Sequence, residues 1–241
     1  MPLAILQREL EAAGDPAKAL FLHRFFKTGP GQYAEGDRFR GLTVPVTRAL
    51  ARRHGDLSWG DLDRLLRSPF HEDRLAALMI LARRAGAKRA APADKDRALD
   101  FYLARTRFIN NWDLVDLSAP AVVGARLVER NDPSLLFSLA RSSLLWERRI
   151  GMVGSYAFIR ARQTSVAFIL AGILLEDRHD LMHKAAGWML REAGKRDLRG
   201  LVLFLERYAA VMPRTMLRYS IEKFTPAERH RWMNAARTLN P

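Results

Sequence analysis

Cysteine is absent from this 241-residue sequence, which excludes disulfides, thiolate zinc sites and a cysteine nucleophile. The absence agrees with a reducing compartment, and we expect a cytoplasmic protein. Long apolar runs are missing as well. The longest, residues 166–175, is about half the length that a membrane-spanning helix needs. We expect a buried helix there, no membrane partner and, because Arg8 and Glu9 interrupt the apolar start, no signal peptide.

Signatures of several common catalytic classes are also missing. The sequence has no nucleophile elbow, no glycine-rich phosphate loop ahead of a helix and no paired carboxylates for acid–base hydrolysis. His179 and His183 stand four residues apart beside Asp180, which formally matches part of the two-histidine zinc motif. That motif requires glutamate in place of Asp180 and a third ligand, which is not evident. We read both as surface histidines and expect neither a metal nor a cofactor.

Acidic residues are too few to balance the basic ones. The 40 lysines and arginines exceed the 26 aspartates and glutamates, giving a formal net charge of +14. So large an excess points to a polyanionic partner, most simply nucleic acid. The basic residues are spread through helical segments rather than gathered in a tail. An anionic membrane surface and a basic surface without a partner remain the alternatives.

Almost every segment has helical rather than alternating periodicity, and helix breakers fall between segments. We therefore expect an all-α fold without strands and a single domain over residues 1–241. The N-terminal helices are expected at residues 2–13, 16–28, 44–54, 58–67 and 69–85, with Asp15 as a cap before Pro16. Residues 29–41 form the one long irregular stretch, which is expected either to contact a ligand or to be mobile.

A repeat follows from the spacing of the more amphipathic helices, which recur roughly every 33 to 38 residues. Such helical pairs stack into a HEAT-like solenoid whose second helices line a concave, here basic, groove. The register places seven residues on that groove: Arg74, Trp112, Asp116, Arg149, Lys184, Trp188 and Arg218.

The stretch Asn110-Asn-Trp-Asp-Leu-Val-Asp116 places Trp112 and Asp116 four residues apart, on one face of a helix. A lone tryptophan is commonly a core residue, but an aspartate is costly in an apolar core unless it is paired. A helix face that carries both Trp112 and Asp116 is therefore more typical of a groove wall than of a core. Asp113 points to a different face, and we interpret it as a first-turn acid favoured by the helix dipole.

Trp188 repeats this pattern on a later helix, where Lys184 precedes it by four residues; packing between repeats is the alternative. Trp146-Glu-Arg-Arg149 contains two adjacent arginines, of which one must face inward. The repeat register selects Arg149 for the groove and leaves Arg148 solvated. Arg74, Lys184 and Arg218 are candidates for phosphate contacts that position a duplex without reading its sequence.

These segments carry a resemblance to a known family. Asn111-Trp-Asp-Leu-Val-Asp116, followed by Pro120 and Gly124, is similar to the signature of the AlkD-type DNA alkylation repair family, which consists of helical-repeat DNA glycosylases. Three further motifs resemble that family in the same order and cover essentially the whole chain: Gly41-Leu-Thr-Val-Pro-Val-Thr-Arg48, Trp146-Glu-Arg-Arg149 and Lys184-Ala-Ala-Gly-Trp-Met-Leu-Arg-Glu192.

The resemblance implies a role for each matched residue. Trp112 and Trp188 are expected to be the aromatic walls around the lesion nucleotide, and Asp116 the catalytic carboxylate. Arg149 is expected to hold the phosphate backbone beside the lesion. A tyrosine of the family faces DNA from the second helix, and the matching residue here is Phe25. The ring is kept for stacking, but a hydrogen bond from its hydroxyl is lost.

The implied activity is that of a monofunctional DNA glycosylase acting in base-excision repair. Its substrate would be double-stranded DNA carrying cationic N3- or N7-alkylated purines of the 3-methyladenine or 7-methylguanine type. Such a base is already a good leaving group, so one carboxylate can suffice to stabilise positive charge on the deoxyribose. The resemblance further implies a monomer that does not flip the base into a pocket.

Two other functions fit the sequence. One is a DNA-structure-binding protein of the same fold that lacks catalysis, although a lone carboxylate facing a polyanion would only weaken binding. The other is a helical-repeat scaffold for an acidic protein partner. That scaffold should bind DNA weakly and tolerate substitution of Trp112 and Asp116.

Overall fold

Helices are the regular elements of this computed structural model, which describes residues 2–87 and 89–235, and the expected all-α class is confirmed. The chain forms two compact units, Met1–Ser118 and Ala119–Pro241. Among the described residues, no helix combines the length and apolar character that crossing a bilayer requires. The expectation of a single domain stays a prediction.

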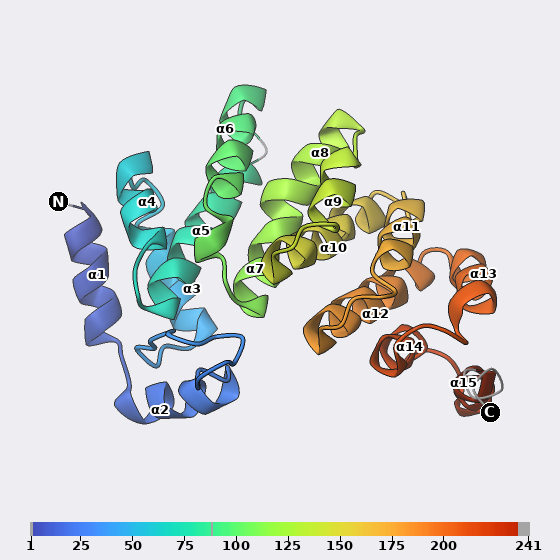
Figure 1. Cartoon of the computed structure of the whole chain (residues 1–241). Coiled ribbons are helices and arrows are strands. Elements are labelled where there is room, and N and C mark those ends of the chain that lie inside the picture. Colours follow the sequence, from blue (N-terminus) through green and yellow to red (C-terminus); the bar gives the residue numbers. More distant parts are fainter. Residues whose placement is uncertain (1, 88, 236–241) are drawn as a thin grey trace. The chain divides into compact units, whose positions relative to one another are not determined.

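The first unit contains the helices up to α7 (Figure 1). They are α1 (Pro2–Ala12), α2 (Pro16–Phe25), α3 (Val44–Arg53), α4 (Trp59–Leu66), α5 (His71–Ala85), α6 (Pro92–Leu103), the 3₁₀ turn η1 (Thr106–Phe108) and α7 (Trp112–Ala119), whose last residue belongs to the second unit. Helix α5 is the centre of this unit, because it packs against α3, α4 and α6 and buries almost all its side chains.

The second unit contains the remaining helices. They are the π-helical turn η2 (Pro120–Gly124), α8 (Ala125–Arg130), α9 (Ser134–Leu139), α10 (Leu145–Arg160), α11 (Ser165–Ile173), α12 (Asp180–Gly194), α13 (Leu198–Tyr208), α14 (Arg214–Ser220) and α15 (Pro226–Ala235). Helix α10 packs on α12 and α12 packs on α14, while α11 and α13 lie against α12. Helices α7, α10, α12 and α14 begin at residues 112, 145, 180 and 214, in agreement with the expected repeat.

Helix ends follow the local chemistry that the sequence indicates. Asp15 caps α2 by accepting hydrogen bonds from the amides of Ala17 and Lys18, with Pro16 in the first turn as expected. Helix α2 ends at Phe25 rather than at residue 28, since Lys27 takes a positive φ of 54°. Helix α5 begins at His71 rather than at residue 69 because Phe70 is extended.

The irregular stretch of residues 29–41 is fixed against α5 near that helix's first turn (Figure 1). The buried carboxylate of Glu72 accepts hydrogen bonds from three successive amides, those of Arg40, Gly41 and Leu42, at 2.8 to 3.2 Å. Arg40 also pairs with Asp73 at 2.8 Å. These charge-assisted bonds hold the end of the stretch in one conformation.

Candidate functional site

Helix α7 presents Trp112 and Asp116 on its partly exposed side. The helix begins at Trp112, so the two residues lie one turn apart, and both are half-buried. Leu114 and Val115, between them in sequence, are fully buried and anchor the opposite side of α7. The amide of Trp112 donates to the side-chain oxygen of buried Asn111 at 2.8 Å, which fixes the start of the helix.

Trp112 packs into an aromatic cluster formed with Phe25, Phe26 and Phe39. Its ring stacks on Phe26 at 5.5 Å between centroids and meets the edge of Phe25 at 6.1 Å. Aromatic pairs of this kind contribute about 1 kcal/mol each beyond burial. Phe26 and Phe39 are buried, whereas Phe25 remains 52% exposed. The structure therefore brings two predicted site residues, Phe25 and Trp112, together at the edge of a rigid core.

Asp116 lies close enough to the buried Tyr102 to affect its ionisation. The hydroxyl groups of Tyr102 and Ser118 are 2.9 Å apart, and Ser118 donates to the carbonyl of Leu114. Burial is the main cause that raises the pKa of Tyr102, and the negative charge of Asp116 raises it further against the opposing hydrogen bond with Ser118. Tyr102 thus stays neutral behind this face of α7.

Asp113 has a partner that the sequence interpretation missed. Its carboxylate bonds to Nε2 of His71 at 2.8 Å, and Nδ1 of His71 lies 3.3 Å from the carboxylate of Asp37. Asn110 and Asn111 also donate to Asp37, at 3.2 and 3.4 Å. This network, centred on Asp37 and His71, connects the irregular stretch, α5 and the start of α7, and it fixes the segment that carries Trp112.

His71 is held as an imidazolium. Burial by itself lowers its pKa, but attraction to Asp113 and hydrogen bonds to Asp113 and Asp37 outweigh burial and raise the pKa to about 9. The ring lies 4.9 Å from Phe39 and 5.0 Å from Phe26. The dense run of charge at residues 71–74, at the head of an otherwise apolar helix, is the sequence signal that could have revealed this network.

Arg74 is placed differently from the sequence prediction. Its guanidinium is buried, pairs with Asp37 at 2.7 Å and donates to the carbonyl of Ser68 at 3.0 Å. A phosphate contact requires an accessible guanidinium, so this placement does not suit the DNA contact expected of Arg74. The physical reason is the buried charge of Asp37, which has to be balanced inside the unit.

In the second unit, Arg149 is buried and, like Arg74, does not offer the accessible guanidinium that its expected phosphate contact requires. Its side chain is 4% exposed and donates to the carbonyl of Leu181 at 2.6 Å. The solvated position expected of Arg148 is wrong, because Arg148 pairs with the largely buried Asp177 at 2.6 Å. Both arginines therefore connect α10 to the segment around the start of α12.

Helices α12 and α14 carry the other predicted residues of the second unit. Trp188 is half-buried and lies 6.3 Å from the ring of Tyr156 on α10. Lys184, one turn earlier, pairs with Asp180 at 2.8 Å, and Arg218 on α14 is exposed. The approach of both units' residues to one groove stays a prediction.

The histidine pair near α12 has local roles. His179 caps the helix by accepting from the amide of Leu181 at 3.1 Å, and Nε2 of His183 lies 2.5 Å from the carbonyl of Asp177. Within residues 2–87 and 89–235, no three His, Cys, Asp or Glu side chains are grouped as a metal site would require.

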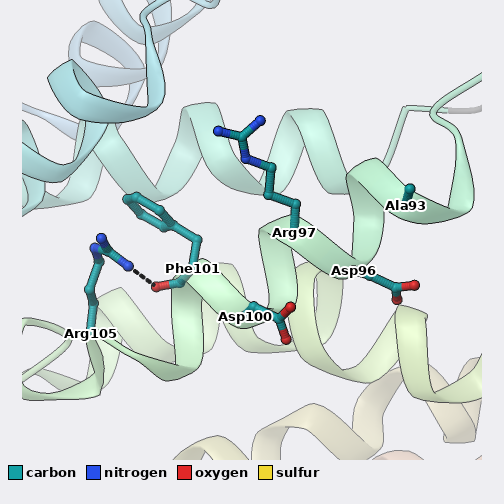
Figure 2. Close-up of a pocket in the computed structure, with 6 residues that line it drawn as sticks. All are labelled: Ala93, Asp96, Arg97, Asp100, Phe101 and Arg105. Atoms are coloured by element: carbon teal, nitrogen blue, oxygen red, sulfur yellow. Dashed lines mark hydrogen bonds between the residues drawn. The ribbon is translucent and has the colours of Figure 1, made fainter.

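An open depression of about 520 Å³ runs along α6 (Figure 2). Arg97 extends away from Asp96 and Asp100 in that view, and the Arg97 guanidinium lies over the ring of Trp59 at 4.6 Å. Arg105 donates to the carbonyl of Phe101 and pairs with Asp63. The depression contains none of the predicted site residues.

One of the comparisons with known proteins identifies a family. A family model described as "DNA alkylation repair enzyme" matches residues 6–224. A solved structure described as a predicted DNA alkylation repair enzyme from Enterococcus faecalis superposes with a TM-score of 0.67. It is 13% identical, and the match covers 88% of this chain and 97% of that one, so this likeness concerns the fold. No curated protein matches the sequence significantly.

Proposed function

This chain belongs to the DNA alkylation repair enzyme family, and from that premise we propose that it is a monofunctional DNA glycosylase acting on cationic N3- and N7-alkylated purines in double-stranded DNA. The reaction is hydrolysis of the N-glycosidic bond, which releases the alkylated base and leaves an abasic site. The observation that carries the proposal is the partly exposed Asp116 one turn from Trp112 on α7.

One carboxylate is enough for this chemistry. Alkylation at a purine ring nitrogen gives the base a positive charge, so the base leaves without a general acid. As the bond breaks, positive charge develops on the deoxyribose, and the carboxylate of Asp116 stabilises that charge and positions the attacking water. Tyr102, buried behind α7, keeps its hydroxyl proton because its pKa is raised, so Asp116 has no second negative charge from Tyr102 beside it.

Aromatic rings supply the second component of the site. The faces of Trp112 and Trp188 attract a cationic nucleotide, each by about 1 kcal/mol. Phe25, half exposed beside Trp112, provides a further stacking surface without the hydroxyl of the corresponding tyrosine. Packing against buried Phe26 holds the Trp112 ring in place.

Basic residues of the second unit complete the proposed interface. Exposed Arg218 and half-buried Lys184 are assigned to DNA phosphates. Arg149, expected at the backbone beside the lesion, is as buried as Arg74 and donates to the carbonyl of Leu181, so it is left out of this set. Arg74 is left out of this set because it is buried on Asp37. In this arrangement the base needs no deep pocket, since recognition acts on the backbone and on the cationic nucleotide.

Asp116→Asn tests the catalytic assignment. Purified protein is incubated with methylated duplex DNA, and released bases are identified by chromatography. We expect base release to fall by about 10²-fold or more because a preorganised charge is removed, while DNA binding persists. Asp113→Asn is the matched control: it should weaken the pairing with His71 and lower stability, yet leave release per folded molecule largely intact. Unchanged release by Asp116→Asn would refute the catalytic role.

The same assay separates the alternative functions. A DNA-structure-binding protein without catalysis would bind duplex DNA in a salt-dependent manner and release no base. A scaffold for an acidic protein partner would bind DNA weakly and tolerate substitution of Trp112 and Asp116.

A further inference from the structure

A cavity of about 370 Å³ lies in the first unit, between α3 and α5, and α7 contributes one residue to it. Three exposed arginines line it: Arg48 and Arg52 lie one turn apart on α3, and Arg83 is in the last turn of α5. The rest of the lining is apolar and consists of Ala51, Met79, Ala82 and Leu117. We call this feature the arginine pocket.

In the part of the chain that the structure describes, the arginines of the pocket have no acidic partner, unlike six of the other arginines of the first unit. Among the described residues, no carboxylate pairs with Arg48, Arg52 or Arg83. Six other arginines of the first unit each pair with a carboxylate within 4 Å: Arg40, Arg53, Arg64, Arg67, Arg74 and Arg105. The pocket therefore gathers positive charge that the chain itself does not neutralise.

Helix ends explain only a part of this arrangement. The carbonyl of Arg52, near the end of α3, accepts a hydrogen bond from Arg83 at 3.1 Å, as expected for cations near a helix C-terminus. That bond uses one of the five N–H donors of Arg83. Arg48 lies in the middle of α3, where no helix end attracts it. Most donors around the pocket are thus available to a ligand.

An anion with an apolar body matches this lining. Guanidinium groups bind phosphate oxygens in a bidentate manner, and an anion between three of them relieves their mutual repulsion. The apolar part of the lining suits the carbon skeleton of a sugar rather than more charge. We propose that the arginine pocket is a phosphate-binding site that holds one backbone phosphate of duplex DNA, with the attached deoxyribose over Met79 and Leu117.

This inference rests on the proposed action on DNA and adds a phosphate contact to those expected from the sequence. Leu117 directly follows Asp116, so the same helix α7 would contact the backbone and carry the proposed catalytic carboxylate. The site gives the first unit a phosphate contact, in place of the one expected from Arg74.

The first experiment compares two neighbouring arginines of α3. Arg52→Gln and Arg53→Gln remove the same formal charge, but Arg52 lines the pocket whereas Arg53 pairs with Glu9 at 3.2 Å. We expect Arg52→Gln to lower the affinity for a short unmodified duplex on the order of tenfold. The slope of log affinity against log salt should become shallower by about 0.9. Arg53→Gln should change both much less; equal effects would show that only net charge matters and would overturn the proposal.

The second experiment fills the pocket with an internal acid. Ala82→Glu places a carboxylate among the three arginines, so thermal stability should stay the same or rise while DNA affinity falls at least as far as in Arg52→Gln. Ala82→Gln, of similar size but uncharged, should keep most of the affinity. Unchanged affinity in a folded Ala82→Glu variant would contradict the proposal.

Inorganic phosphate distinguishes the possible sources of the anion. If it raises the Tm of the parent protein but not of Ala82→Glu, while Arg52→Gln and Arg53→Gln bind DNA alike, the pocket serves a small anion and the DNA assignment is wrong. All binding assays use unmodified duplex, so they do not depend on base release. Absence of base release would refute the glycosylase proposal and leave the phosphate site standing.

Discussion

Two aspartates three residues apart on α7 have different surroundings. Both are half-buried, but Asp113 pairs with buried His71, whereas Asp116 lies one turn from Trp112. Helical geometry alone sets them only about 60° apart, so their different surroundings come from the partners that the fold brings to each. The pairing with His71 gives Asp113 a structural role, whereas Asp116 is the proposed catalytic carboxylate.

The raised pKa of His71 predicts a loss of stability in alkali. Because the folded-state pKa of about 9 lies above the unfolded value near 6.5, the stabilisation is complete below pH 6.5 and is lost as pH rises through 9. The groups that decide it are Asp37, Asp113 and the opposing Arg74. The full difference is on the order of 3 kcal/mol. Urea unfolding between pH 6 and 10 measures it.

His71→Gln is the control for this titration. The variant should be less stable than the parent at neutral pH because it leaves Asp113 without its cation and Asp37 with Arg74 alone. Its stability should also change less between pH 7 and 9.5. Parallel pH profiles of the two proteins would show that His71 does not carry the effect.

At the scale of elements, glycine decides how closely the helices of the second unit pack. A Cβ on Gly187 of α12 would lie 2.5 Å from the carbonyl oxygen of Met216 and 2.6 Å from Cβ of Tyr219, both on α14. Gly151 on α10 has a similar position against α9, where a Cβ would lie 2.7 Å from the carbonyl oxygen of Leu136. The glycine before Trp188 is therefore explained by close helix packing.

Gly187→Ala should destabilise the protein by about 1 to 3 kcal/mol, because the backbone of α14 has to move to admit a methyl group. Thermal unfolding measures the change. Gly172→Ala is the matched control, since nothing lies within 4 Å of a Cβ at that position of α11. It should be neutral or stabilise by up to about 1 kcal/mol through helix propensity. Equal destabilisation of the protein by both substitutions would contradict the packing argument.

At the scale of the whole molecule, a formal net charge of +14 should dominate binding to undamaged DNA. With roughly six phosphate contacts, affinity falls about 10³-fold between 50 and 200 mM salt. Base release at saturating DNA should change little over the same range, since the proposed chemistry depends on local charge. Fluorescence anisotropy and single-turnover kinetics measure the two quantities. A salt-independent affinity would argue for a protein partner instead of DNA.

The sequence by itself determined the helical class, the recurrence of helices near residues 112, 145, 180 and 214, and the shared face of Trp112 and Asp116. These features depend on periodicity, caps and spacing within a few turns, which a sequence records directly.

Only the tertiary structure decided which charged residues are internal and which are available. From the sequence, Arg74 and Arg148 look like surface cations. In the structure Arg74 pairs with Asp37, 37 positions away, and Arg148 pairs with Asp177, 29 positions away. Likewise, Arg48, Arg52 and Arg83 meet at one cavity because α3 and α5 pack together. The physical reason is that burial makes a charge depend on partners brought together by folding, and such partners leave no periodic mark in the sequence.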